Sequence, residues 1–207
     1  MKGLKRAHAA GAGVLAAVVA AMLAGCASAP PDQFYTLADS GTGAVPPAAS
    51  GPVYIEMRPV TVPDQVRRNQ LVVGTGSGQV DLLEHHRWAS KLDDQIGNAL
   101  SLGVAAQLGA VDVYRNPAPK GATVYRIGAN VMRFESVLGE YALVDAVWSV
   151  RRVGSDAVQT CRSVFRESVG AGHPALVAGH RAALAKLSAR IAEGVRSEAA
   201  GQALSCA

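Results

Sequence analysis

Residues 141–152 read YALVDAVWSVRR, and this stretch sets the expected architecture. Every second residue is apolar, which is the period of a β-strand that buries one face. The other face is also largely apolar, so the strand is expected to lie in the centre of its sheet. The residues of the first apolar face are Ala142, Val144, Ala146, Trp148 and Val150.

Two further strands are predicted beside this one. Residues 125–137 precede it across a turn at Gly139, and residues 158–169 follow it across a turn at residues 154–156. Such short turns connect antiparallel neighbours, so the three segments predict a meander. In the first segment the apolar alternation changes phase after Val131, which predicts a β-bulge.

Two amphipathic helices are expected. The first is predicted from Ser90, a residue type that caps helices, to Leu108, with Gly109 as its stop signal; the second extends from about Pro174 to Gly201. Each carries one apolar stripe at helical spacing. The stripes consist of Leu92, Ile96, Leu100, Val104 and Leu108 in the first helix, and of Val177, Leu184, Leu187, Ile191 and Val195, with His180 at a core position, in the second.

Shorter strands are predicted ahead of the first helix. FYTLA (34–38) is interpreted as a strand, the alternative being part of a tether, and the flexible loop of residues 40–51 follows it. Residues 53–60 predict another strand, and residues 71–75 and 79–84 predict a hairpin.

Taken together, these elements predict one α+β domain over residues 33–207. Strands, a helix, three more strands and a final helix favour an antiparallel-rich sheet with two helices packed on one face.

The start of the chain has the layout of a bacterial export signal. Three basic residues among the first six precede an uncharged segment over residues 9–25. The tetrad Leu-Ala-Gly-Cys that ends this region resembles a lipobox, in which the leader is cleaved between Gly25 and Cys26 and the cysteine is lipidated. The alternative is that Cys26 is an ordinary residue of a signal cleaved elsewhere.

Cleavage at this site would remove residues 1–25 and leave residues 26–32 as a lipidated tether. A covalent lipid on Cys26 is then the only group expected besides the protein, and it would hold the domain at a membrane. Ala27 follows the cysteine where lipoproteins retained in the inner membrane tend to have Asp. By this resemblance the outer membrane is favoured, with the domain facing the periplasm.

The charge of the mature chain is close to neutral. Three of the 20 Lys and Arg residues lie in the leader, which leaves 17 basic against 16 acidic residues. Nucleic-acid binding needs a concentrated positive surface, and no run of Lys or Arg supplies one. A nucleic-acid partner is therefore not expected.

Two cysteines remain after lipidation of Cys26. Export places Cys161 and Cys206 in an oxidising compartment, where disulfides persist. A bridge between them would tie the C-terminal tail to a strand. Two free thiols are the alternative.

The sequence gives no sign of catalysis or of a metal site. His85 and His86 are adjacent, so they are read as surface residues instead of joint ligands of one ion. His173 and His180 are two helical turns apart, too far to share an ion. Neither a Gly-x-Ser-x-Gly elbow nor a His-Glu-x-x-His motif is present. We therefore expect no enzyme, no catalytic residue and no cofactor.

Arginine and tryptophan residues ahead of the first helix are candidates for binding a partner. Arg67 and Arg68 interrupt a strand-edge region, and Arg87 and Trp88 lie at the start of the helix. Arg and Trp are frequent at the centres of protein contacts. For Trp88 the alternative is an apolar plug over the end of the helix.

At these residues the chain resembles the ABC-type transport auxiliary lipoprotein family. The pattern comprises FYTL after the lipidated cysteine, the segment ending QLVV, RWASKL (87–92), and MRFESVLGEYALVDAVWSV (132–150). The order of these motifs behind a lipobox carries the resemblance. Ser90 and Lys91 depart from the Glu-Pro that the family often has after Arg-Trp-Ala.

The resemblance implies a non-catalytic subunit of an envelope lipid transport system. Family members work with an MCE-domain protein that bridges the periplasm, and sometimes with an ABC transporter of the inner membrane. The lipoprotein would dock that bridge at the outer membrane, with self-association into a homo-oligomer as a further possibility. Two alternatives stay open: an outer-membrane assembly factor, and a periplasmic lipid-binding lipoprotein with an internal cavity.

Overall fold

The computed structural model describes residues 30–38, 53–76, 78–203 and 205–206. The chain divides into two units, Met1–Pro31 and Asp32–Ala207, and the second holds every helix and strand described below. The leader (1–25), Cys26 and the loop of residues 40–51 lie outside the described residues.

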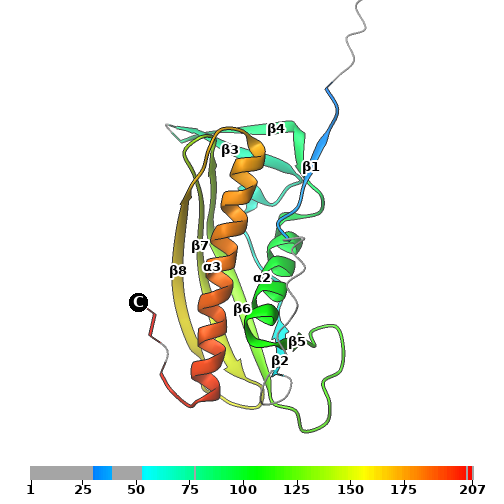
Figure 1. Cartoon of the computed structure of the whole chain (residues 1–207), viewed down its shortest axis with the longest axis vertical. Coiled ribbons are helices and arrows are strands. Elements are labelled where there is room, and N and C mark those ends of the chain that lie inside the picture. The colour runs from blue at the N-terminus through cyan, green and yellow to red at the C-terminus, as the bar shows by residue number, and fades with distance from the viewer. Residues whose placement is uncertain (1–29, 39–52, 77, 204, 207) are drawn as a thin grey trace, which may run out of the picture. The chain divides into compact units, whose positions relative to one another are not determined.

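The fold is α+β, as the sequence predicts. The described residues form two long helices and two sheets, a three-stranded one with strand order β1-β4-β3 and a five-stranded one with order β5-β2-β6-β7-β8 (Figure 1). In chain order the elements are β1 (Gln33–Tyr35), β2 (Val53–Met57), the short 3₁₀ helix η1 (Asp64–Val66), β3 (Gln70–Gly76), β4 (Gln79–Trp88), α2 (Leu92–Leu108), β5 (Ala110–Asp112), β6 (Val124–Val137), β7 (Tyr141–Arg152), β8 (Gln159–Ser168) and α3 (His173–Ala199).

The antiparallel parts of the prediction are confirmed. β6, β7 and β8 form the expected meander, and β3 pairs with β4 as a hairpin. The register between β6 and β7 shifts between Val131 and Arg133, where the change of phase predicts a bulge.

The strands form two sheets instead of the one expected, and both sheets are mixed, since each also contains parallel pairs. β1 runs parallel to β4, and β2 runs parallel to both β5 and β6. These pairings join segments that are far apart in the chain, so no short turn in the sequence predicts them.

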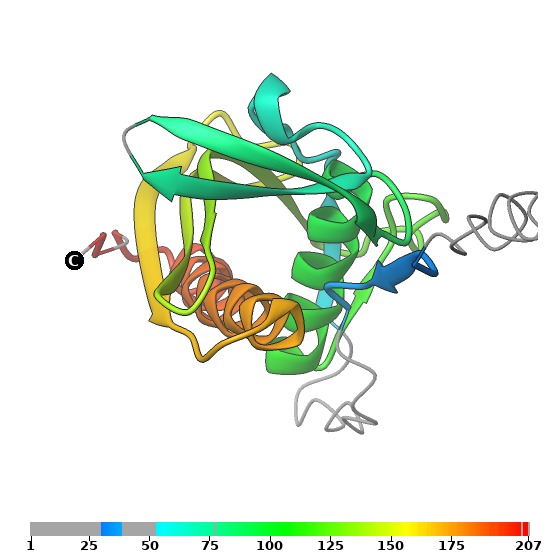
Figure 2. The same cartoon turned by 90° about the horizontal axis from the view of Figure 1, so that it is seen from above.

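Both helices pack on one face of the five-stranded sheet, as expected. Figure 1 shows α2 and α3 in front of the strands, and Figure 2 shows the β3–β4 hairpin across one end. The apolar face of β7 lies beneath the helices, where Val144, Trp148 and Val150 are at most 1% exposed. The apolar stripes of both helices contribute to the same core cluster.

The helix ends follow the sequence in part. Gly109 ends α2 in the left-handed conformation, with φ of 62°, which the absence of a side chain allows. At the other end Lys91, and not Ser90, is the N-cap, and it makes no side-chain cap bond. Ser90 Oγ instead accepts a hydrogen bond from Gln95 Nε2 at 3.1 Å.

Gly179 marks the closest approach of α3 to the sheet. A β-carbon at this position would overlap the Val169 side chain and lie 3.0 Å from the Ala142 β-carbon. Glycine in a helix interior costs about 1 kcal/mol relative to alanine. Here the close packing against β7 explains why glycine is present.

We expect Gly179→Leu to lower the free energy of unfolding by roughly 3 kcal/mol, because the larger side chain forces α3 off the sheet. Ala182→Leu, on an exposed position of the same helix, is the matched control, with an expected change within about 0.5 kcal/mol. Urea denaturation of both variants measures the difference. Equal stability of the two would contradict the close packing.

Candidate partner-binding surface

The first strand is held in place by three elements. The backbone N–H of Ala89 donates to Tyr35 O at 2.8 Å beside the parallel β1–β4 pairing. Arg181 of α3 donates from Nη2 to Thr36 O at 2.7 Å. Gln95 Oε1 of α2 accepts from the Leu37 backbone at 2.9 Å. The segment at the start of this unit is therefore fixed to the domain.

The sequence gives no signal for this role of Gln95 and Arg181. A polar residue beside an apolar stripe looks the same whether it faces water or bonds to a distant strand. Gln95, which the helical pattern places mainly off the stripe, is only 7% exposed.

The partner candidates Arg67 and Arg68 are exposed on the loop between η1 and β3. Arg67 forms an ion pair with Asp64. The backbone of this loop reaches β4, because Trp88 N–H donates to Asn69 O at 2.6 Å. Both arginines therefore remain candidates for contact with a partner.

Arg87 is tied to the domain more closely than these two. Its side chain is 36% exposed, and its Nε donates to Glu84 O at 2.7 Å. The same nitrogen lies 3.7 Å from Asp32, which precedes β1. Arg87 thus contributes to holding β1, and only part of it is open to a partner.

Trp88 is not a contact residue, and the partner-binding prediction for it is corrected here. It is 3% exposed and belongs to the core, because it ends β4 with its ring turned toward α3 and β6. The alternative reading, an apolar plug, describes its position.

Trp88 is part of an aromatic cluster around His180. The rings of Phe134 and His180 stack at 3.9 Å between centroids, and Trp88 meets both edge-on. Ser136 Oγ lies 2.8 Å from His180 Nε2. Complete burial lowers the pKa of His180 to about 3, so the ring is neutral in the folded protein at neutral pH.

The other histidines of the described residues make pairwise contacts. His86 of β4 and His173 of α3 stack at 3.7 Å, and His85 Nδ1 lies 2.9 Å from Asp32 Oδ1. Burial, together with the charge of His86, lowers the pKa of His173. Within the residues that the structure describes, no group of three His, Cys, Asp or Glu side chains is placed to hold a metal ion.

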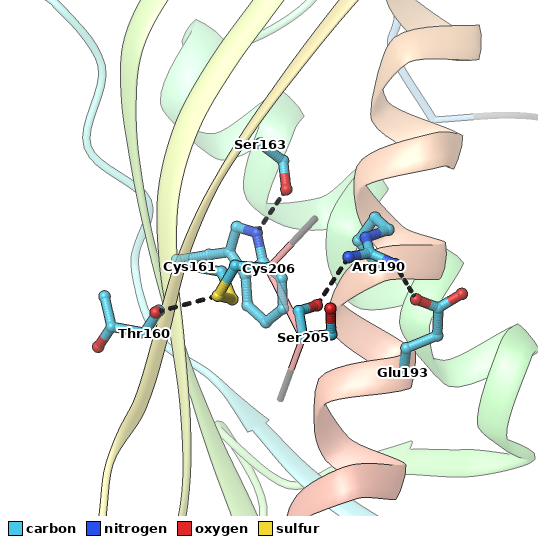
Figure 3. The surroundings of a disulfide bond; sticks show 8 residues. Thr160, Cys161, Ser163, Arg190, Glu193, Ser205 and Cys206 are labelled. Atoms are coloured by element: carbon cyan, nitrogen blue, oxygen red, sulfur yellow. Dashed lines mark hydrogen bonds and ion pairs between the residues drawn. A yellow bond between two sulfur atoms is a disulfide. The ribbon is translucent and has the colours of Figure 1, made fainter. Parts of the chain in front are cut away.

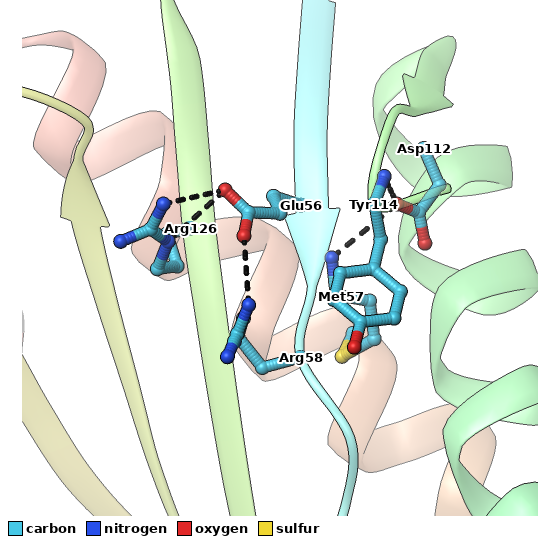
Figure 4. Close-up of polar contacts among 6 residues, drawn as sticks. All are labelled: Glu56, Met57, Arg58, Asp112, Tyr114 and Arg126. Carbon is cyan, nitrogen blue, oxygen red and sulfur yellow. Dashed lines mark hydrogen bonds and ion pairs between the residues drawn. The ribbon is translucent and has the colours of Figure 1, made fainter. Parts of the chain in front are cut away.

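A cleft of about 710 Å³ opens between α2 and the end of β2. Asp112 forms part of its wall: its Oδ1 accepts from Tyr114 N–H at 2.9 Å and from Met57 N–H at 3.3 Å (Figure 4). The guanidinium of Arg58 lies 5.3 Å from the centre of the Tyr114 ring. Polar and charged side chains dominate the lining, namely Thr36, Arg58, Ser90, Asp93, Asp94, Gln95, Asn98, Ser101, Asp112, Tyr114, Arg115 and Asn116. Such a lining does not favour an acyl chain, which needs apolar walls.

Cys161 and Cys206 form a disulfide, with 5.4 Å between their Cα atoms. Figure 3 shows the bridge between β8 and the tail that follows α3. Arg190 Nη2 of α3 donates to Ser205 O at 2.9 Å, and Gln159 Nε2 donates to Gln202 O at 3.0 Å. The tail is therefore attached to the first half of β8.

The two helices of the described residues are not membrane spans. Neither α2 nor α3 combines the length and the apolarity that crossing a bilayer requires.

Comparison with solved structures shows the fold. An uncharacterised protein of known crystal structure matches 80% of this chain and 99% of its own length, with a TM-score of 0.63 and 20% identity. A protein from Xanthomonas campestris matches 84% of this chain and 90% of its own, with a TM-score of 0.53 and 14% identity.

Sequence comparison shows which proteins this chain is related to. The proteins named intermembrane transport lipoprotein PqiC of Escherichia coli K12 and of Shigella flexneri are each 27% identical over 141 residues, which cover 68% of this chain and 74% of theirs. The family model described as ABC-type transport auxiliary lipoprotein component matches residues 35–192, from the end of β1 well into α3. The chain therefore belongs to the ABC-type transport auxiliary lipoprotein family.

Proposed function

We propose that this protein is a non-catalytic lipoprotein subunit of an MCE-type intermembrane lipid transport system. A lipid on Cys26 anchors it in the outer membrane, and its domain docks the periplasm-spanning MCE-domain protein that works with an inner-membrane transporter. The observation that carries this proposal is the family match over residues 35–192, behind a sequence that resembles a lipobox. The relatives named for intermembrane transport support the same process.

The fixed position of β1 supports an anchored docking subunit. The tether of residues 26–32 leads directly into β1, which is bonded to β4, α2 and α3. A lipid on Cys26 would therefore attach to a segment that the domain holds firmly.

The exposed loop of Arg67 and Arg68 supports a docking surface. It lies beside the end of β4, and its guanidinium groups suit carboxylates of a partner protein. The polar cleft gives less support to the alternative of a periplasmic lipid-binding protein, since a carrier needs an apolar cavity for acyl chains.

The experiment is crosslinking of the tagged, lipidated protein in its own cells, followed by purification in detergent and identification of the captured proteins. We expect an MCE-domain protein, and we expect the Arg67→Glu/Arg68→Glu variant to capture several-fold less of it. Arg115→Glu/Lys120→Glu, two exposed basic residues elsewhere, is the charge-matched control. Capture of outer-membrane assembly proteins alone would instead support the assembly-factor alternative and contradict the MCE role.

The anchor is tested separately. Cys26→Ser should leave the domain folded, because residues from Leu37 onward build the described core, and should release it from membranes, because one acylated cysteine supplies the lipid attachment. Fractionation of the cell envelope measures the release. A variant that still sediments with the outer membrane would show that something other than Cys26 holds the protein there.

A further inference from the structure

The five-stranded sheet has an open face on the side away from the helices. Residues directly opposite each other on paired strands share a face. Trp148 and its partners Ala129 and Cys161 are buried under the helices, so the alternate residues lie on the other side. That side, here called the arginine face, includes Arg126 and Arg133 of β6, Arg151 of β7, and Arg162 and Arg166 of β8.

Positive charge is in excess on the arginine face. Its five arginines meet three carboxylates, which pair with Arg126, Arg133 and Arg162. Figure 4 shows one of these pairs, in which Arg126 binds Glu56. Among the described residues Arg151 and Arg166 have no carboxylate partner; Arg166 instead lies 3.8 Å from the centre of the Tyr141 ring.

Asp145 holds the guanidinium group of Arg162 in a fixed orientation. This carboxylate is fully buried, and Arg162 donates to it from Nε at 2.9 Å and from Nη2 at 2.6 Å. Arg162 nevertheless keeps 62% of its side chain exposed. It therefore presents the remaining N–H groups of a positioned guanidinium to the solvent.

β8 is the last strand of the sheet, so among the described strands one side of its backbone has no partner. On the side of β7, Val169 N–H donates to Glu140 O, which directly precedes β7, and on the opposite side Thr160 O contacts Cys206 Sγ of the tail. By alternation, the backbone groups of Arg162, Val164 and Arg166 point to this outer edge. Within the described residues, no hydrogen bond is made to them there.

We propose that an extended acidic segment of a partner protein adds to the outer edge of β8. Its backbone pairs with Arg162, Val164 and Arg166, and two carboxylates four residues apart meet the two guanidinium groups. An apolar side chain between those carboxylates covers Val164, which is 51% exposed. This surface is separate from the loop of Arg67 and Arg68, and it does not depend on the MCE assignment.

Charge and geometry favour a protein segment over a membrane surface. Binding to anionic lipid depends on the number of basic groups that stay uncompensated, and three of the five arginines already pair with carboxylates of the domain. The free strand edge, by contrast, offers N–H and C=O groups that only another backbone satisfies in register. Planar guanidinium groups held at fixed positions suit individual carboxylates.

The test uses the full lipidated chain in detergent and a labelled peptide with Glu-Thr-Val-Thr-Glu at its centre. The control peptide has Lys in place of both Glu residues. We expect the acidic peptide to bind, with weaker binding at higher salt, and the basic peptide not to bind. Fluorescence anisotropy measures both affinities.

Two variants address the two parts of the interaction. Arg166→Glu reverses one charge, and Val164→Pro removes an outward N–H without a loss from the β7–β8 ladder. Each should weaken binding of the acidic peptide by roughly tenfold or more. Arg115→Glu, an exposed charge reversal away from β8, is the matched control, with an expected change within about twofold. Circular dichroism establishes that each variant is folded, and Arg166→Glu keeps the test valid if Val164→Pro does not fold.

Four results would overturn the proposal. These are no binding of the acidic peptide, an equal loss of binding in Arg115→Glu, undiminished binding in a folded Val164→Pro variant, and preferential binding of the protein to vesicles of phosphatidylglycerol and phosphatidylethanolamine through Arg166. The first would mean that Arg162 and Arg166 protect the strand edge against pairing, as charged residues on edge strands do.

Discussion

Acidification from pH 6.5 to pH 3 is expected to lower the free energy of unfolding by roughly 4 kcal/mol through His180 alone. The folded-state pKa of about 3 lies below the ordinary value of 6.5, because protonation would place a charge in an apolar site. The unfolded chain therefore binds the proton first. Stability is complete above pH 6.5 and falls by about 1.4 kcal/mol for each pH unit below it.

The measurement is urea unfolding at several pH values between 7 and about 4.5, for wild type and His180→Gln. His180→Gln should be less stable than wild type at neutral pH. Its free energy of unfolding should also fall much less steeply as the pH is lowered. His173, whose lowered pKa acts in the same direction, is present in both proteins, and His173→Gln separates its share. The hydrogen bond from Arg162 lowers the pKa of Asp145 below 3.8. Protonation of Asp145 therefore affects the free energy of unfolding only below the pH range of this measurement. An unchanged slope in His180→Gln would refute the assignment.

Loss of the disulfide is expected to lower the free energy of unfolding by roughly 4 kcal/mol. The bridge closes a loop with a sequence separation of 45, and the loop-entropy model gives this value for such a loop. Cys206→Ser is the appropriate variant, since Cys206 lies in the exposed tail, whereas Cys161 is 4% exposed and its truncation would also leave a cavity. Most of the loss should therefore arise in the unfolded state.

A reducing agent supplies the matched control. It should bring wild type to the stability of Cys206→Ser and should leave the variant unchanged. Alkylation of the unreduced protein followed by mass determination tests the bridge directly. Two alkylated cysteines besides Cys26 would mean that the bridge is absent, and the expected stability difference would then disappear.

Much of the secondary structure is predictable from the sequence, because local patterns decide it. The alternation in residues 141–152, the phase change after Val131 and the glycine at position 109 each depend on neighbours within one strand or helix. By contrast, β5 (Ala110–Asp112) has only three residues, too few for a recognisable period.

The candidate binding residues were less predictable, because exposure depends on packing. Trp88 and Arg87 are adjacent in the sequence, yet the first is a core residue and the second is partly open. Alternation along β6, β7 and β8 could have grouped Arg126, Arg151 and Arg162 on one face. The alternation alone could not have predicted which face of the sheet the helices cover.

The sequence by itself determined the family, the α+β class, the antiparallel meander, the β3–β4 hairpin and the positions of both helices. Each of these follows from a periodic pattern, a short turn or an ordered set of motifs. Only the tertiary structure decided the division into two mixed sheets, the attachment of β1 and the open arginine face. These depend on contacts between residues far apart in the chain, such as the 145 positions between Thr36 and Arg181, and no local pattern encodes them.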